Sequence, residues 1–162
     1  MGQVVDDVKT VYVETTIMSY LAALPSRDLI KAARQEVTWE WWNKRRGAYR
    51  VYASQVVARE AREGDPDAAR RRLELLSGLP LLDVTDEAIN LATALISQGL
   101  LPDAAADDAL HLGVAAVHGM DYLLTWNCTH LANAAFRDGA SFWLAENGYD
   151  PPSVCTPDEL ME

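Results

Sequence analysis

Short apolar segments alternate with amphipathic segments along the chain. Four segments have the β-branched and aromatic content of buried strands, at residues 11–13, 49–53, 79–84 and 122–125. Helical spacing and helix start and stop signals appear between them, at residues 17–24, 28–46, 55–63, 66–77, 85–99, 107–119 and 138–147. This alternation predicts an α/β fold with a mostly parallel central sheet and helices on both faces.

The length and composition of the chain predict a single domain. Its 162 residues contain no repeat, linker or low-complexity tract that would divide it. We expect a core at roughly residues 10–148 and a tail at 149–162, which either adds a weak edge strand or wraps the surface.

Localisation signals are also missing from the sequence. No apolar run approaches the ~20 residues of a membrane span, and the start MGQVVDDVKT lacks the basic and apolar regions of a signal peptide. Cys128 and Cys155 show neither metal-ligand spacing nor a disulfide framework. We therefore expect a cytoplasmic protein without a membrane partner and with reduced thiols.

Charge is distributed unevenly along the chain. The net charge of −10 argues at first against a nucleic-acid partner. However, residues 27–72 hold 12 of the 14 basic residues and 7 of the 24 acidic ones, so this span is +5 and the remainder is −15. A basic side for a polyanion can coexist with an acidic remainder, although solvated amphipathic helices are the better explanation for any single arginine.

Four polar side chains are expected near one edge of the predicted sheet. They follow strands or open the helices beside them, and they are Glu14, Glu60, Asp108 and Asn127. In open parallel sheets this carboxyl edge is where sites usually form. Carboxylate and amide oxygens suit hard divalent cations such as Mg²⁺ and Mn²⁺, and clustered carboxylates would repel one another without a cation.

Four segments in this order resemble PIN-domain proteins, the fold of the VapC-type toxin ribonucleases of toxin–antitoxin systems. They are VYVETTIMSYL, SQVVAREAREGD, DALHLGVAAVHGMDYLLTWNCTHLAN and CTPDEL. The resemblance covers roughly residues 10–160. It implies a metal-dependent endoribonuclease that cuts single-stranded RNA, with a small antitoxin and a second copy of the chain as partners.

The resemblance also implies a metal site made of Glu14, Glu60, Asp108 and Asn127 that binds Mg²⁺ or Mn²⁺. Two positions depart from the family pattern, which usually has Asp at both the first and the fourth. Glu14 moves its carboxylate out by one methylene, and Asn127 supplies an oxygen without charge. We expect weaker metal binding as a result.

Several residues near these four have simpler readings. Glu63 competes with Glu60, and the family motif favours Glu60. We assign Asp107 to capping the helix and Asp108 to the metal. His111 lies one turn after Asp108 on the same helix face, where it could touch the site, and packing inside the helix is its expected role.

Further polar and aromatic residues are expected to cap a helix, to add a hydrogen bond or to pack. Thr15 or Thr16 is expected to cap the first helix, with Thr16 also near the metal or a phosphate, and Thr125 to add a hydrogen bond. Trp39 and Trp42 share a helix face suited to core or dimer packing, although a nucleic-acid stacking platform is the alternative.

The sequence is compatible with two functions from different classes. The leading hypothesis is the metal-dependent ribonuclease toxin. The alternative is a PIN-fold binding module for RNA or protein whose catalysis is weakened or lost, because Glu14 and Asn127 depart from the usual acids.

Overall fold

Five parallel strands form the centre of the molecule. The structure is a computed structural model, and it describes residues 7–161. The strands are β1 (Thr10–Val13), β2 (Arg50–Ser54), β3 (Leu81–Leu82), β4 (Tyr122–Leu124) and β5 (Ser153–Cys155). They lie in the order β3-β2-β1-β4-β5, and every pairing is parallel. The predicted α/β class and parallel sheet are therefore confirmed.

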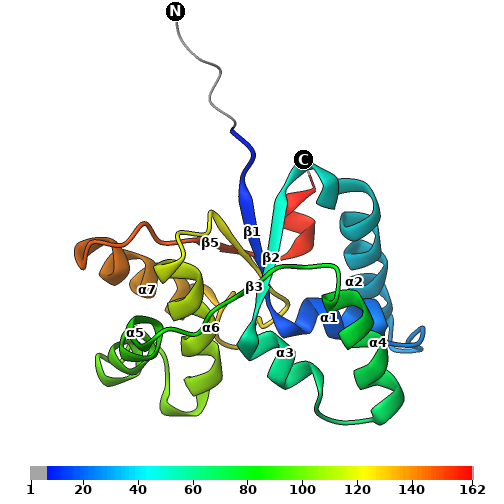
Figure 1. Cartoon of the computed structure of the whole chain (residues 1–162), viewed down its shortest axis with the longest axis horizontal. Coiled ribbons are helices and arrows are strands. Elements are labelled where there is room, and N and C mark those ends of the chain that lie inside the picture. The colour runs from blue at the N-terminus through cyan, green and yellow to red at the C-terminus, as the bar shows by residue number, and fades with distance from the viewer. Residues whose placement is uncertain (1–6, 162) are drawn as a thin grey trace, which may run out of the picture.

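Helices enclose this sheet from two sides. They are α1 (Thr15–Ala22), α2 (Leu29–Glu40), α3 (Gln55–Ala61), α4 (Pro66–Leu76), α5 (Asp86–Ser97), α6 (Ala106–Val117) and α7 (Ala134–Glu146). Figure 1 shows α1, α2 and α4 on one side of the sheet and α5, α6 and α7 on the other. Among the described residues, no helix combines the length and apolar character needed to cross a membrane.

The strand order reverses at β1, which lies between β2 and β4. Val13 pairs with Leu124 at the ends of β1 and β4, and the backbone N–H of Glu14 continues the ladder by donating to the Leu124 carbonyl at 3.0 Å. The residues that follow these two strands therefore start side by side. A crevice at such a reversal point is where open parallel sheets usually bind ligands.

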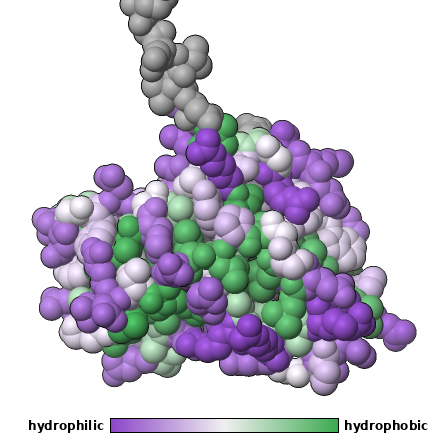
Figure 2. All heavy atoms as spheres, in the orientation of Figure 1, coloured by the Kyte–Doolittle hydropathy of each residue, from purple (hydrophilic) through white to green (hydrophobic). Residues whose placement is uncertain are grey.

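The core lies on both faces of the central strands. Val11, Val13 and Leu123 are fully buried, as continuous apolar strands covered by helices on both faces should be. Toward the β3 edge, Leu81 and Leu82 are only half-buried. Figure 2 shows the molecule from the same side as Figure 1, and apolar residues gather over the middle of this view, where β2 and β3 lie.

Two predicted elements differ in extent from the structure, and the tail matches one of its predicted alternatives. β3 has two residues, where the pattern predicted 79–84. α7 begins at Ala134, four residues before the predicted start, because the Asn133 side chain caps it by accepting from the Ala135 N–H. The tail forms an edge strand, β5, which confirms one of the two predicted alternatives.

The tryptophan-bearing helix also differs from its prediction. α2 ends at Glu40, and a π-helical turn follows over Trp41–Arg45. The wider turn directs Trp41 and Trp42 into the core, with 0% and 7% of their surface exposed, whereas Trp39 is half-buried and donates to the Leu21 carbonyl at 3.2 Å. Trp42 packs inward as expected, but Trp41 is its buried neighbour rather than Trp39.

Gly113 allows α6 to approach α5 closely. A Cβ at this position would lie 2.7 Å from the Ala88 carbonyl oxygen, which is backbone and cannot easily move. We expect Gly113→Ala to lower the free energy of unfolding by about 1–3 kcal/mol through overpacking, although alanine is the better helix former. Urea unfolding measures this. Gly139→Ala in α7 is the matched control: its nearest neighbour would be a leucine methyl at 3.9 Å, so it should stabilise the protein by up to ~1 kcal/mol.

Candidate metal centre at the strand ends

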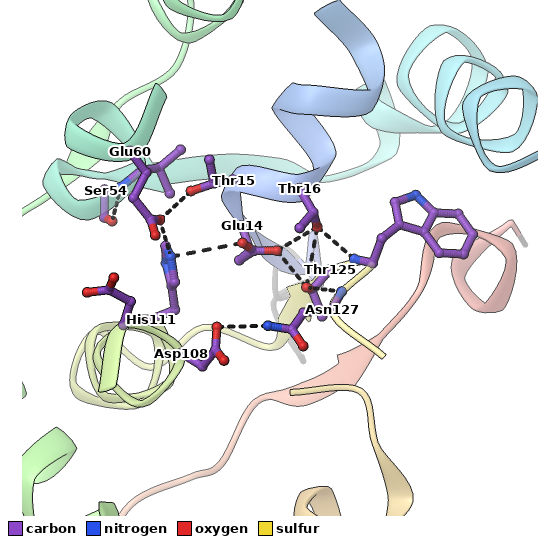
Figure 3. A network of polar contacts seen from close by, with 12 residues as sticks. Glu14, Thr15, Thr16, Ser54, Glu60, Asp108, His111, Thr125 and Asn127 are labelled. Carbon is purple, nitrogen blue, oxygen red and sulfur yellow. Dashed lines mark hydrogen bonds and ion pairs between the residues drawn. The ribbon is translucent and has the colours of Figure 1, made fainter. Parts of the chain in front are cut away.

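Glu14 is a buried carboxylate at the end of β1. It occupies the N-cap position of α1, and only 4% of its surface is exposed. Its Oε1 accepts hydrogen bonds from the hydroxyls of Thr16 and Thr125, both at 2.6 Å. Figure 3 shows these two threonines on one side of Glu14 and His111 on the other. The carboxylate is therefore held in one orientation before any ligand arrives.

Glu60 approaches the same place from α3. That helix is capped by Ser54, which accepts from the Val57 N–H. Glu60 Oε1 accepts from the Thr15 hydroxyl at 2.6 Å and lies 2.6 Å from Nε2 of His111. The side chain is 20% exposed, so one face of it remains open to solvent.

His111 of α6 joins the two glutamates electrostatically. Its Nε2 lies 4.0 Å from Glu14 Oε2 in addition to its short contact with Glu60. Burial disfavours a charged imidazole, but the hydrogen bond to Glu60 and the negative charges of Glu14, Glu60 and Asp108 outweigh it and raise the pKa of His111. Burial would likewise raise the pKa of Glu60, but His111 and Thr15 together lower it. Each member of this pair therefore favours the charged form of the other.

Asp108 belongs to a second polar group on the opposite side of the site. Its Oδ1 accepts from Nδ2 of Asn127 at 2.8 Å, and its Oδ2 lies 2.9 Å from Nδ1 of His130. Asn127 Oδ1 in turn accepts the backbone N–H of His130 at 2.9 Å. Asn127 thus acts locally as a turn residue and as a donor to Asp108.

The described residues contain one cluster that matches a metal-ligand arrangement. It consists of Glu14, Glu60 and His111, whose ligand atoms all lie within 4.8 Å of one another. Asp108 is not part of this cluster, although its charge reaches His111. In Figure 3 the side chains of Glu14, Glu60, Asp108 and Asn127 lie around the same region. Such a set of oxygens and one imidazole is chemically suited to a divalent cation.

The structure corrects two predicted capping roles. Ala105, not Asp107, is the N-cap of α6, because a 3₁₀ turn over Asp103–Ala105 leads into it. Asp107 lies in the first turn and pairs with Arg59 at 3.1 Å. Neither Thr15 nor Thr16 caps α1: their hydroxyls bond to Glu60 and Glu14 instead.

Other sequence expectations have clear outcomes. The hydrogen bond expected from Thr125 is confirmed by its contact with Glu14. His111 is buried as expected, and it also contacts both glutamates, which is the other role that its place one turn after Asp108 allowed. The contact of His130 with Asp108 was missed. His111 had a signal in its place one helical turn after Asp108, whereas His130 sits in a loop with no periodicity to place it.

The Glu60–His111 pair predicts how stability depends on pH in the metal-free protein. The raised pKa of His111 adds stability that is complete below its ordinary 6.5 and is lost as the pH rises through the folded value. The lowered pKa of Glu60 adds stability that is complete above 4.5 and is lost as the pH falls through the folded value. We therefore expect Glu60→Gln, in EDTA, to lower the free energy of unfolding by about 1–3 kcal/mol. This loss should be largest between pH 4.5 and pH 6.5, the two ordinary pKa values.

Urea unfolding of both proteins across this range measures the difference. The difference in free energy of unfolding between wild type and Glu60→Gln should become smaller as the pH rises above the folded pKa of His111. A gap that stays constant from acid to alkaline pH would contradict the charged pair. Glu63→Gln is the control, because Glu63 is exposed and lies outside the cluster.

Comparison with known proteins gives matches in structure only. Neither a protein-family model nor a curated protein sequence matches the chain. A chain of FitAB bound to an IR36 DNA fragment matches with a TM-score of 0.54 and 18% identity, over 91% of this chain and 94% of that chain. A chain of VapBC2 from Rickettsia felis, bound to a DNA fragment from their promoter, matches with a TM-score of 0.53 and 16% identity, over 91% and 98%.

A third solved structure gives the same result. A chain of FitAcB from Neisseria gonorrhoeae matches with a TM-score of 0.54 and 18% identity, over 93% of this chain and 99% of that chain. Matches at such low identity establish the fold alone, and any chemical function has to be argued from the residues of the site. The chain has the PIN-like fold of these proteins, with a parallel sheet enclosed by helices over nearly its whole length.

Proposed function

We propose that the chain is a metal-dependent endoribonuclease that cuts single-stranded RNA in the cytoplasm, as the toxin of a toxin–antitoxin pair. One observation carries this proposal: Glu14, Glu60 and Asp108 lie around one region at the carboxyl ends of the central strands, with Glu14 almost wholly buried. Burying a carboxylate beside other acids is costly unless a cation or a charged partner compensates it. We assign Glu14, Glu60, Asp108 and Asn127 to the catalytic metal site.

The side chains of this site hold and orient its acids. Thr16 and Thr125 fix one oxygen of Glu14, which leaves the other directed toward His111. Thr15 of α1 donates to Oε1 of Glu60, the same oxygen that contacts His111. A bound Mg²⁺ or Mn²⁺ would supply activation of a water and stabilisation of the charge that develops on the phosphate.

The surroundings of the site support a polyanionic substrate. The basic span 27–72 includes α2, α3 and α4, so positive charge is concentrated on the side that carries Glu60. Arg59 adjoins Glu60 and pairs with Asp107 at 3.1 Å, with both side chains more than half exposed. Because exposed ion pairs contribute little, this guanidinium is available to an RNA phosphate.

The proposed partners are RNA, a small antitoxin protein and a second copy of the chain. The structurally similar chains support the antitoxin, because they come from FitAB and VapBC2, which are complexes with antitoxins. The dimer rests on the family resemblance, and sedimentation equilibrium measures it directly. A short reading frame just upstream of the gene would favour the antitoxin.

One observation favours a second candidate function, a PIN-fold binding module without catalysis. Asn127 donates its amide to Asp108, and its oxygen is already bonded to the backbone of His130. Asp108 is therefore satisfied by hydrogen bonds where the family's usual fourth acid would add charge. In this alternative the fold binds RNA or protein and does not cut RNA.

Cleavage of labelled single-stranded RNA discriminates between the two candidates. Purified wild-type protein with Mn²⁺ should cut the RNA, and Asp108→Asn should reduce the rate at least about 100-fold, or ~2.7 kcal/mol. EDTA should stop cleavage by the wild type. Equal cleavage by both proteins would indicate a contaminating nuclease, and RNA binding without cleavage would support the binding module.

A further inference from the structure

His111 faces the candidate metal centre with one ring nitrogen. Its imidazole is 1% exposed, and Nε2 lies 2.6 Å from Glu60 Oε1 and 4.0 Å from Glu14 Oε2. The three ligand atoms lie within 4.8 Å of one another. An ion at about 2.1 Å from each ligand can bridge atoms up to about 4.2 Å apart, which includes the 2.6 Å and 4.0 Å separations from Nε2. The ring is therefore placed where a ligand of the ion would be.

A hydrogen-bond chain holds the same ring from behind. Nδ1 lies 2.6 Å from the hydroxyl of Tyr12, which lies 2.7 Å from the hydroxyl of Ser54. Burial raises the pKa of Tyr12, so the phenol keeps its proton. When Nδ1–H donates to Tyr12 and Tyr12 donates to Ser54, each of these groups has a partner and Nε2 faces the glutamates. Metal-binding histidines are usually held through their second nitrogen in this way.

Asn127 is placed less well than His111 to complete the ligand set. Its amide nitrogen points at Asp108, and its oxygen accepts the His130 N–H at 2.9 Å. His111 Nε2, by contrast, has only carboxylate oxygens in front of it. The two side chains thus differ in the direction that their donor atoms face.

We propose that Nε2 of His111 is a ligand of the divalent ion together with Glu14 and Glu60, and that this imidazole makes the site prefer late first-row ions such as Co²⁺ to Mg²⁺. Imidazole suits transition ions, whereas Mg²⁺ prefers oxygen alone, and affinity rises from Mn²⁺ to Co²⁺ at a given site. The proposal rests on the metal-dependent part of the proposed function, and it adds a ligand and an order of ion preference.

Pulsed EPR of the protein loaded with Mn²⁺ tests this ligand directly, because a coordinated imidazole gives ¹⁴N modulation. The chain has three histidines. In the double variant His118→Gln/His130→Gln only His111 remains, so the modulation should persist there and disappear in His111→Gln. The double variant leaves the buried ring untouched, so the test does not depend on whether His111→Gln folds.

Titration calorimetry with Mg²⁺, Mn²⁺ and Co²⁺ gives the second readout. Affinity should rise in that order for the wild type, and His111→Gln should lower Co²⁺ affinity about 10- to 100-fold or more with a smaller effect on Mg²⁺. Absence of ¹⁴N modulation in either the wild type or the double variant, or its persistence in His111→Gln, would overturn the proposal. If the protein shows ¹⁴N modulation but cuts no RNA, His111 remains a metal ligand and the ribonuclease function is rejected. If the protein cuts RNA with a metal ion but shows no modulation, the ribonuclease function remains and His111 is rejected as a ligand.

Discussion

Asn127→Asp is expected to destabilise the metal-free protein and to strengthen its binding of Mn²⁺. In the wild type, Nδ2 of Asn127 donates to Asp108 at 2.8 Å. Asp at this position would place two carboxylates in contact, replacing a hydrogen bond by repulsion, at a cost of about 1–3 kcal/mol. The turn itself should persist, because an Asp oxygen can still accept the N–H of His130. With the ion present, the added negative charge favours binding, and we expect about tenfold higher affinity.

Urea unfolding in EDTA and in saturating Mn²⁺ measures both effects with one protein pair. The variant should be the less stable protein in EDTA and should gain more from Mn²⁺ than the wild type does, because an ion that binds only the folded state stabilises it. Asn90→Asp is the control, since Asn90 is exposed on α5. If Asn127→Asp changes stability equally with and without the ion, Asn127 does not border the metal centre.

Glu14→Gln is expected to abolish most activity while the fold is retained. The amide has almost the same shape, and its oxygen can still accept from Thr16 and Thr125 as Glu14 Oε1 does. What is lost is the negative charge. We therefore expect RNA cleavage to fall about 100-fold or more, equivalent to ~2.7 kcal/mol, and Mn²⁺ affinity to fall at least about tenfold.

Initial rates on labelled RNA, with calorimetry for Mn²⁺, check this prediction. Glu63→Gln removes the same charge from an exposed glutamate outside the cluster, and it should leave both rate and affinity unchanged. Similar losses in the two variants would mean that overall charge, rather than the position of Glu14, governs activity. A thermal melt close to that of the wild type establishes that Glu14→Gln is folded.

Much of the fold could be predicted because its strands are apolar and most of the helices between them begin at side-chain caps. β1 and β4 are buried at every residue after their first, so their apolar runs were unambiguous. β3 was overestimated because apolar residues such as Leu79 and Val84 flank it without joining the ladder. The π-helical turn after α2 could not be foreseen, since it depends on packing Trp41 and Trp42 together against the core.

The candidate site could be predicted only as far as strand ends determine position. Glu14 follows β1 directly, and Asn127 follows β4 within three residues, so their neighbourhood depended on the parallel order alone. The contacts of His111 and His130 depended on how α6 faces α3 and on the path of the loop after β4. His111 had one local signal, its place one helical turn after Asp108, but that signal does not reveal its contact with Glu60 of α3, and His130 had none. The Asp107 assignment was wrong for a similar reason, because the 3₁₀ turn before α6 moved the cap to Ala105.

A crystal soaked in Mn²⁺ tests the central claim most directly, namely that the buried acids at the strand ends hold a divalent cation. Anomalous scattering at the manganese edge locates the ion independently of the protein atoms. Our account predicts one anomalous peak in contact with Glu14, Glu60 and Nε2 of His111, with the Asn127 amide still bonded to Asp108. An anomalous peak elsewhere, or none at these residues at saturating Mn²⁺, would contradict the account.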